Sequence, residues 1–150
     1  MTWLPETAAG DAPLARVFGL LPAGWETFRA LHTRLWDAGL DPRALDLCRR
    51  RVTKLLGRDA DDGLPGPPAG GGATPAQIAA LSRWPTDPAF SDDERACLAF
   101  AEQYVIDPHA FGDADIAALE ARFGARGVAA LVLAVAVFEA TARFRAALDA

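Results

Sequence analysis

Apolar residues recur every three or four positions along most of this chain, which is the spacing of one face of an α-helix. The clearest example is the segment 42–56, whose apolar positions are Leu45, Cys48, Val52, Leu55 and Leu56. Asp41 and Pro42 supply a cap and a first-turn residue at its start, and Gly57 follows its end. The pattern therefore predicts a helix over 42–56.

Six further segments have helical spacing or helical start and stop signals. They are 13–18, 22–38, a short segment from 74, 91–107, 113–124 and 127–148. Capping boxes mark two of the starts, because Thr74 is followed by Gln77 and Ser91 by Glu94. Val, Ile and Thr are scarce, whereas alanine, the best helix former, is abundant. We therefore predict an all-α helical bundle of about seven helices with no sheet.

The segment 57–73 interrupts this pattern. It holds six glycines and three prolines. Ordering glycine costs much backbone entropy, and proline has no backbone N–H to donate, so a helix or a strand is disfavoured there. Neither side of it makes a convincing core alone, and 150 residues suit one domain. We therefore expect a single domain spanning 1–150, with a flexible Gly/Pro loop at 57–73.

Charge and hydropathy narrow the classes of partner. The net charge of −5 argues against nucleic acid, because phosphate binding needs a strongly basic face. The longest uncharged apolar run, 128–138, has eleven residues, and a membrane span needs about 20. We therefore expect no membrane partner, a buried core helix over that run, and a cytoplasmic protein.

The few cysteines and histidines limit the chemistry further. Cys48 and Cys97 cannot form a disulfide framework, and each lies on an apolar helical stripe, where a thiol acts as a small hydrophobe. Of the two histidines, His32 lies in an amphipathic helix and is interpreted as a packing or surface residue. No metal-ligand spacing joins these side chains. We expect neither a bound metal nor a cofactor.

Three motifs, in order along the chain, carry a resemblance to a known family. They are LDLCRRRVTKLLG at 45–57, FSDDERACLAFAEQY at 90–104 and FEATARFR at 138–145. With their spacing, they resemble the AhpD-like/carboxymuconolactone decarboxylase family over about residues 25–148. The resemblance implies an all-helical fold and a homo-oligomer. It also implies either reduction of peroxides and oxidised peroxiredoxin, or cofactor-free decarboxylation of a small lactone acid.

The chain departs from the redox branch of that family directly after Gly57. That branch has Cys-x-x-Cys there, whereas this chain has Arg58 and Asp61 at the two cysteine positions. Asp46 stands at the place of the branch's proton-relay glutamate and is one methylene shorter. A thiol peroxidase needs a thiolate of lowered pKa and a resolving thiol nearby. The redox motif is therefore degenerate, and peroxidase activity through the remaining cysteines is the least favoured interpretation.

Glu139 and Arg143 form the first candidate constellation. They lie four residues apart directly after the apolar run of the last predicted helix, where charged side chains are tolerated only when they are paired. One interpretation is an internal or intersubunit salt bridge. The other makes Arg143 an anchor for a substrate carboxylate, with Glu139 orienting it.

The polar face of the helix over 42–56 offers a second constellation. Asp46 and Arg50 are spaced as an ordinary surface ion pair, so Asp46 is interpreted as a solvated or subunit-facing charge, with catalysis as the alternative. The run from Arg49 to Arg51 is interpreted as a mostly solvated face. Arg49 alone leans toward the apolar stripe and could reach a carboxylate in a pocket or on a neighbouring subunit.

A third constellation lies at the end of the helix over 91–107 and in the turn after it. A histidine beside a carboxylate is a common general base, which makes His109 a candidate. Glu102 and Tyr104 precede it in sequence, although Glu102 falls on the polar face, away from Tyr104. The sequence Asp107-Pro108-His109 is also an ordinary helix-stopping turn.

Two function hypotheses follow. The first is a cofactor-free acid–base enzyme that decarboxylates, isomerises or cyclises a small organic acid, a lyase-like activity. It assigns catalysis to His109, Glu139, Asp46 and Glu102, and substrate binding to Arg143, Arg49 and Tyr104. The second is a non-catalytic oligomeric scaffold or small-ligand binder. Convergence of these side chains on one enclosed cavity would favour the first, and charges paired only with one another would favour the second.

Overall fold

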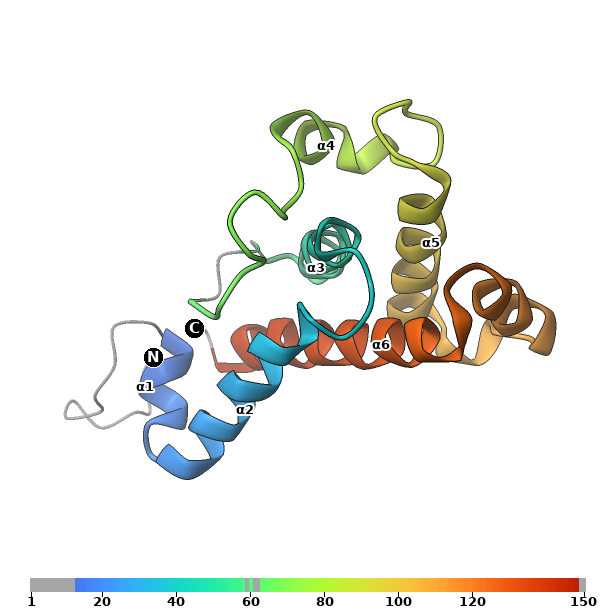
Figure 1. Cartoon of the computed structure of the whole chain (residues 1–150). Coiled ribbons are helices and arrows are strands. Elements are labelled where there is room, and N and C mark those ends of the chain that lie inside the picture. The colour runs from blue at the N-terminus through green and yellow to red at the C-terminus, as the bar shows by residue number, and fades with distance from the viewer. Residues whose placement is uncertain (1–12, 59, 61–62, 149–150) are drawn as a thin grey trace.

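The computed structural model describes residues 13–58, 60 and 63–148, and these residues form helices and no strand. The helices are α1 (Pro13–Phe18), α2 (Pro22–Leu35), α3 (Pro42–Leu55), α4 (Pro75–Ala80), α5 (Asp92–Ile106) and α6 (Asp113–Leu148). Two short 3-10 helices, η1 (Leu81–Arg83) and η2 (Pro108–Ala110), follow α4 and α5. The prediction of an all-α fold is confirmed (Figure 1).

The described residues hold six α-helices rather than seven, and the difference lies in α6. The predicted helices over 113–124 and 127–148 are joined, with a bend at Gly124, where φ is 69° and ψ is 166°. A positive φ favours glycine, since other residues would be strained there. Glycine also fits at Gly127, where an added Cβ would lie 2.6 Å from the Cβ of Phe123. Figure 1 shows the segment 113–123 turning away from the segment 125–148.

Helix α3 lies at the centre of the fold, packed against α5 and α6, while α1 and α2 pack on α6 (Figure 1). Three residues of its predicted apolar stripe, Leu45, Cys48 and Val52, have no exposed surface, and Leu55 and Leu56 are half-buried. The three fully buried side chains join Cys97 of α5 and Phe138 of α6 in the main hydrophobic core. Burial of such a stripe is what holds an amphipathic helix in place.

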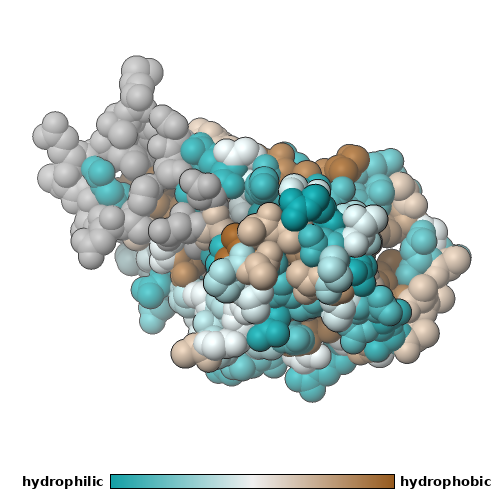
Figure 2. All heavy atoms as spheres, turned by 90° about the horizontal axis from the view of Figure 1, so that it is seen from above, coloured by the Kyte–Doolittle hydropathy of each residue, from teal (hydrophilic) through white to brown (hydrophobic). Residues whose placement is uncertain are grey.

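Helices α4 and η1 cover a second, smaller core. It contains Leu47, Ala80, Leu81, Phe90 and Leu98. Both predicted capping boxes are present, and they are joined because Gln77 Nε2 donates a hydrogen bond to Glu94 Oε1 at 3.0 Å. This hydrogen bond links the first turn of α4 to the first turn of α5. Seen from the side of α4, hydrophilic and hydrophobic residues are interspersed over the surface (Figure 2).

The described part of the Gly/Pro loop folds back against the helices. Leu64 is buried, and the carbonyl of Pro65 accepts a hydrogen bond from Trp36 Nε1 at 3.0 Å. Arg43 Nε donates to the carbonyl of Gly72 at 3.3 Å. Asp61 lies outside the described residues. The loop is therefore held at several points, and its flexibility stays a prediction.

The segment 125–148 of α6 is buried on one face only. Val132 and Leu133 are 38% and 45% exposed, whereas Leu131, Val135 and Phe138 are buried, so the run predicted as a buried core helix is buried only in part. The helices α1, α2, α3 and α5 pack against α6. Among the described residues, α6 is the one helix long and apolar enough to cross a membrane, a test that core helices of soluble proteins also pass.

Candidate functional site

The carboxylate of Asp46 lies inside the protein, so the prediction of a solvated or subunit-facing charge is wrong. Asp46 is 1% exposed because the Gly/Pro loop covers it. The backbone N–H of Ala73, at the end of that loop, donates to Oδ2 at 3.0 Å, and Arg50 Nε donates to the same oxygen at 3.0 Å. Arg49 donates to Oδ1 through Nη2 at 2.9 Å and Nε at 3.2 Å.

These contacts set the protonation state of Asp46. Burial alone would raise the pKa of Asp46, but the N–H of Ala73, the hydrogen bond from Arg50 and the charge of Arg49 outweigh it and lower the pKa below its ordinary value. A carboxylate offers about four acceptor sites, and four donors already occupy them. Asp46 is therefore a weak base whose oxygens are engaged by its own chain.

The arginine run beside Asp46 is also less solvated than predicted. Arg49 is buried at 7% exposure, its guanidinium lies 6.0 Å from the centroid of the Trp36 ring, and Nη1 donates to the carbonyl of Ala60 at 2.6 Å. Arg51 reaches across to α5 instead of pointing into solvent. The run is covered because the loop lies on one side of α3 and α5 on the other. Arg49 does reach a carboxylate, that of Asp46 in its own helix.

Glu102 joins three elements. Its Oε2 accepts a hydrogen bond from Arg51 Nε of α3 at 2.7 Å and another from Trp84 Nε1, next to η1, at 3.0 Å. Burial would raise the pKa of Glu102, but the hydrogen bonds from Arg51 and Trp84 and the charge of Arg51 outweigh it and lower that pKa. Like Asp46, this carboxylate is held ionised by an arginine of the same chain.

The other two residues of that constellation have different surroundings. Tyr104 is half-buried, and its ring centroid lies 6.0 Å from that of Phe100. His109 is exposed in η2, and its backbone N–H donates to Asp107 Oδ1 at 3.0 Å. Among the described residues, no hydrogen bond joins the His109 side chain to a carboxylate. The helix-stopping turn that the sequence indicated is present.

Glu139 and Arg143 form the predicted pair, with Arg143 Nη2 2.8 Å from Glu139 Oε1. The pair is partly exposed in this chain, because the side chain of Arg143 is 58% exposed and that of Glu139 is 18% exposed. The intersubunit salt bridge stays a prediction. An exposed pair at this spacing contributes only about 0.3–0.5 kcal/mol to stability.

The two cysteines are core residues, as predicted. Burial raises the pKa of the Cys48 thiol well above its ordinary value. Burial, together with the charges of Asp93, Asp41 and Glu94, raises the pKa of Cys97 to about 12. Both side chains are therefore thiols at neutral pH, whereas a peroxidase reacts through a thiolate.

The position that matches the family's first redox cysteine has a structural contact instead. Arg58 Nη2 donates to the carbonyl of Arg145 near the end of α6, at 2.8 Å.

Within the described part of the chain, no three side chains of His, Cys, Asp or Glu are close enough together to hold a metal ion. His32 is buried, and its ring packs edge-on against Trp36 and Phe138.

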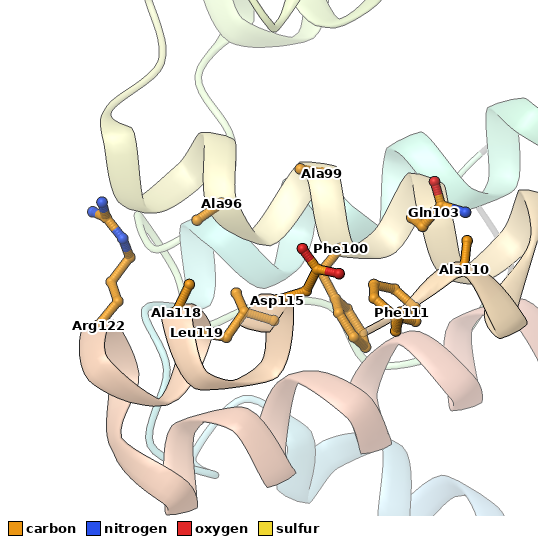
Figure 3. Close-up of a pocket in the computed structure, with 10 residues that line it drawn as sticks. All are labelled: Ala96, Ala99, Phe100, Gln103, Ala110, Phe111, Asp115, Ala118, Leu119 and Arg122. Carbon is orange, nitrogen blue, oxygen red and sulfur yellow. The ribbon is translucent and has the colours of Figure 1, made fainter. Parts of the chain in front are cut away.

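A groove lies between α5 and the segment 113–123 of α6 (Figure 3). It has a volume of about 540 Å³, an apolar floor that includes Phe100 and Phe111, and the polar side chains of Gln103, Asp115 and Arg122. None of the seven predicted site residues lines this groove or the two smaller ones, between α2 and α6 and between the starts of α3 and α5. Sequence reasoning missed the groove, because nothing local marks a gap between two helices.

Comparison with known proteins adds no assignment: no protein-family model matches the chain, and no curated protein shows significant similarity to it. The resemblance to the AhpD-like/carboxymuconolactone decarboxylase family therefore rests on the three motifs and stays a prediction.

Proposed function

We propose that this chain is a non-catalytic, homo-oligomeric scaffold, descended from the AhpD-like/carboxymuconolactone decarboxylase family after loss of its redox cysteines. The observation that carries the proposal is the pairing of the candidate acids. Asp46, Glu102 and Glu139 each bind an arginine of the same chain, and none of them lines a described groove. The acid–base enzyme stays a prediction, because none of the three grooves described above is lined by these acids.

An uncovered apolar surface on α1, α2 and α6 supports the oligomer. A groove of about 420 Å³ between α2 and α6 is lined almost wholly by apolar side chains, among them Trp25, Phe28 and Phe144. Leu21, directly before α2, is 68% exposed, and Leu133 of α6 is 45% exposed. Exposed apolar patches of this kind mark interaction sites. A second copy of the chain is the occupant that the family resemblance implies.

Sedimentation of the wild type and two variants tests the proposal. Leu133→Glu places a charge on the apolar surface and is expected to shift the oligomer to monomer at micromolar concentration. Ile106→Glu is the matched control, because Ile106 is an apolar residue at the end of α5 that is 65% exposed, compared with 45% for Leu133. The proposal fails if the wild type sediments only as a monomer, or if the two variants dissociate to the same extent.

A further inference from the structure

The groove between α5 and the first segment of α6 has the form of a small-molecule site (Figure 3). Alanines at 96 and 99 of α5 and at 118 of α6 line its walls and leave space between the helices. On its floor the rings of Phe100 and Phe111 stack at 4.8 Å between centroids, next to Leu119. Its volume of about 540 Å³ lies in the range of pockets that hold small organic molecules.

The polar groups of the groove offer acceptors without matching donors. Asp115 Oδ2 accepts a hydrogen bond from the backbone N–H of Gly112 at 2.9 Å, and its other oxygen has no hydrogen-bond partner among the described residues. The amide nitrogen of Gln103 donates to the carbonyl of Asp107 at 2.8 Å, which leaves its carbonyl oxygen as an acceptor. In Figure 3 the Asp115 carboxylate is directed toward the space between the helices, beside Phe100.

The one cation in the lining is already neutralised. Arg122, at the far end of the groove, forms an ion pair with Asp93 of α5 through Nη1 and Oδ1. An anionic ligand would have to compete with Asp93 for this guanidinium and would meet the negative charge of Asp115. The groove therefore carries a net negative charge above an aromatic floor.

We infer that this groove binds an organic cation, namely an ammonium group carried on an apolar body. The ammonium would form an ion pair with Asp115, while the apolar body would pack on Phe100 and Phe111. Aromatic faces also attract cations directly. This ligand has the opposite charge to the organic acid suggested by the sequence candidates, and the inference does not depend on the oligomer.

Calorimetric titration with a matched pair of probes tests the inference. Phenethylammonium and 3-phenylpropionate have the same phenylethyl body and differ in the sign of the charged group. We expect saturable binding of phenethylammonium at one site per chain and at least about tenfold weaker binding of 3-phenylpropionate. Absence of saturable phenethylammonium binding, or equal binding of the two probes, would overturn the inference.

Two substitutions place the binding in the groove. Asp115→Asn removes the charge, and its amide oxygen can still accept the hydrogen bond from Gly112, so the helix start is preserved. We expect it to weaken phenethylammonium binding by at least about tenfold. Asp113→Asn is the control, because Asp113 lies in the same turn of α6 but does not line the groove. An equal loss in both variants would show attraction to surface charge instead of a site.

Discussion

Two helices of this protein carry the same local pattern, an acid followed four residues later by an arginine, with opposite outcomes. In α3, Asp46 is 1% exposed and accepts hydrogen bonds from Arg49, Arg50 and the backbone of Ala73. In α6, Arg143 of the corresponding pair is 58% exposed and Glu139 is 18% exposed. The sequence indicated a solvated or subunit-facing Asp46 and, as one interpretation, an internal or intersubunit salt bridge between Glu139 and Arg143. What covers a helix face, not the spacing of its charges, decides whether an ion pair is structural.

The largest effect is expected from Asp46→Ala. It would remove the acceptor that the buried Arg49 and the N–H of Ala73 share with the partly exposed Arg50, which costs about 3–5 kcal/mol of unfolding free energy. Glu139→Ala is the matched variant in α6, where the partner Arg143 is 58% exposed, with an expected cost of about 0.3–0.5 kcal/mol. Urea denaturation measures both. Equal losses for the two variants would remove the contrast between the helices.

The second largest effect is expected from low pH, which protonates Asp46 and weakens its ion pairs with Arg49 and Arg50. The pKa of Asp46 is lower in the folded protein than in the unfolded chain, so the folded state binds the proton less readily. The stabilisation contributed by ionised Asp46 is fully present above about pH 3.9, the ordinary pKa of aspartate. It is lost as the pH falls through the pKa of Asp46 in the folded protein. The difference in unfolding free energy between wild type and Asp46→Asn should therefore shrink below about pH 4. A difference that stays constant from pH 7 to pH 3 would contradict this account.

A smaller effect is expected from closing the space between the loop and Asp46. In Gly72→Ala, the new Cβ would lie 3.2 Å from Asp46 Oδ2 and 3.2 Å from Pro67 Cγ. We expect a loss of about 1 kcal/mol from this crowding, measured by thermal or urea unfolding. Gly66→Ala is the control in the same loop, because an added Cβ there meets nothing within 4 Å. If Gly72→Ala is as stable as Gly66→Ala, the loop does not press on the carboxylate.

Much of the fold follows from the sequence because it depends on neighbours within one or two helical turns. Asp41, Thr74 and Ser91 cap the helices that follow them, as their positions predicted. Cys48 of α3 and Cys97 of α5 are both buried, as the apolar spacing of their helices predicted. Gly124 was predicted to end a helix, and it bends α6 at that residue.

The candidate site was predicted less well, because it depends on which segments meet in space. Asp46 is buried by Ala73, 27 residues further along the chain. Glu102 is engaged by Arg51, which is 51 residues away. The groove beside Asp115 is lined by residues of both α5 and the first segment of α6, and the stacked rings of Phe100 and Phe111 belong to its lining.

The sequence alone therefore determined the all-α class, the helix starts and the buried thiols, since helical period and capping act over about four residues. Tertiary structure decided which charges are covered, which apolar face stays open and where a groove forms. These properties depend on packing between distant segments, and a helix has the same local pattern whether a loop lies over it or water does.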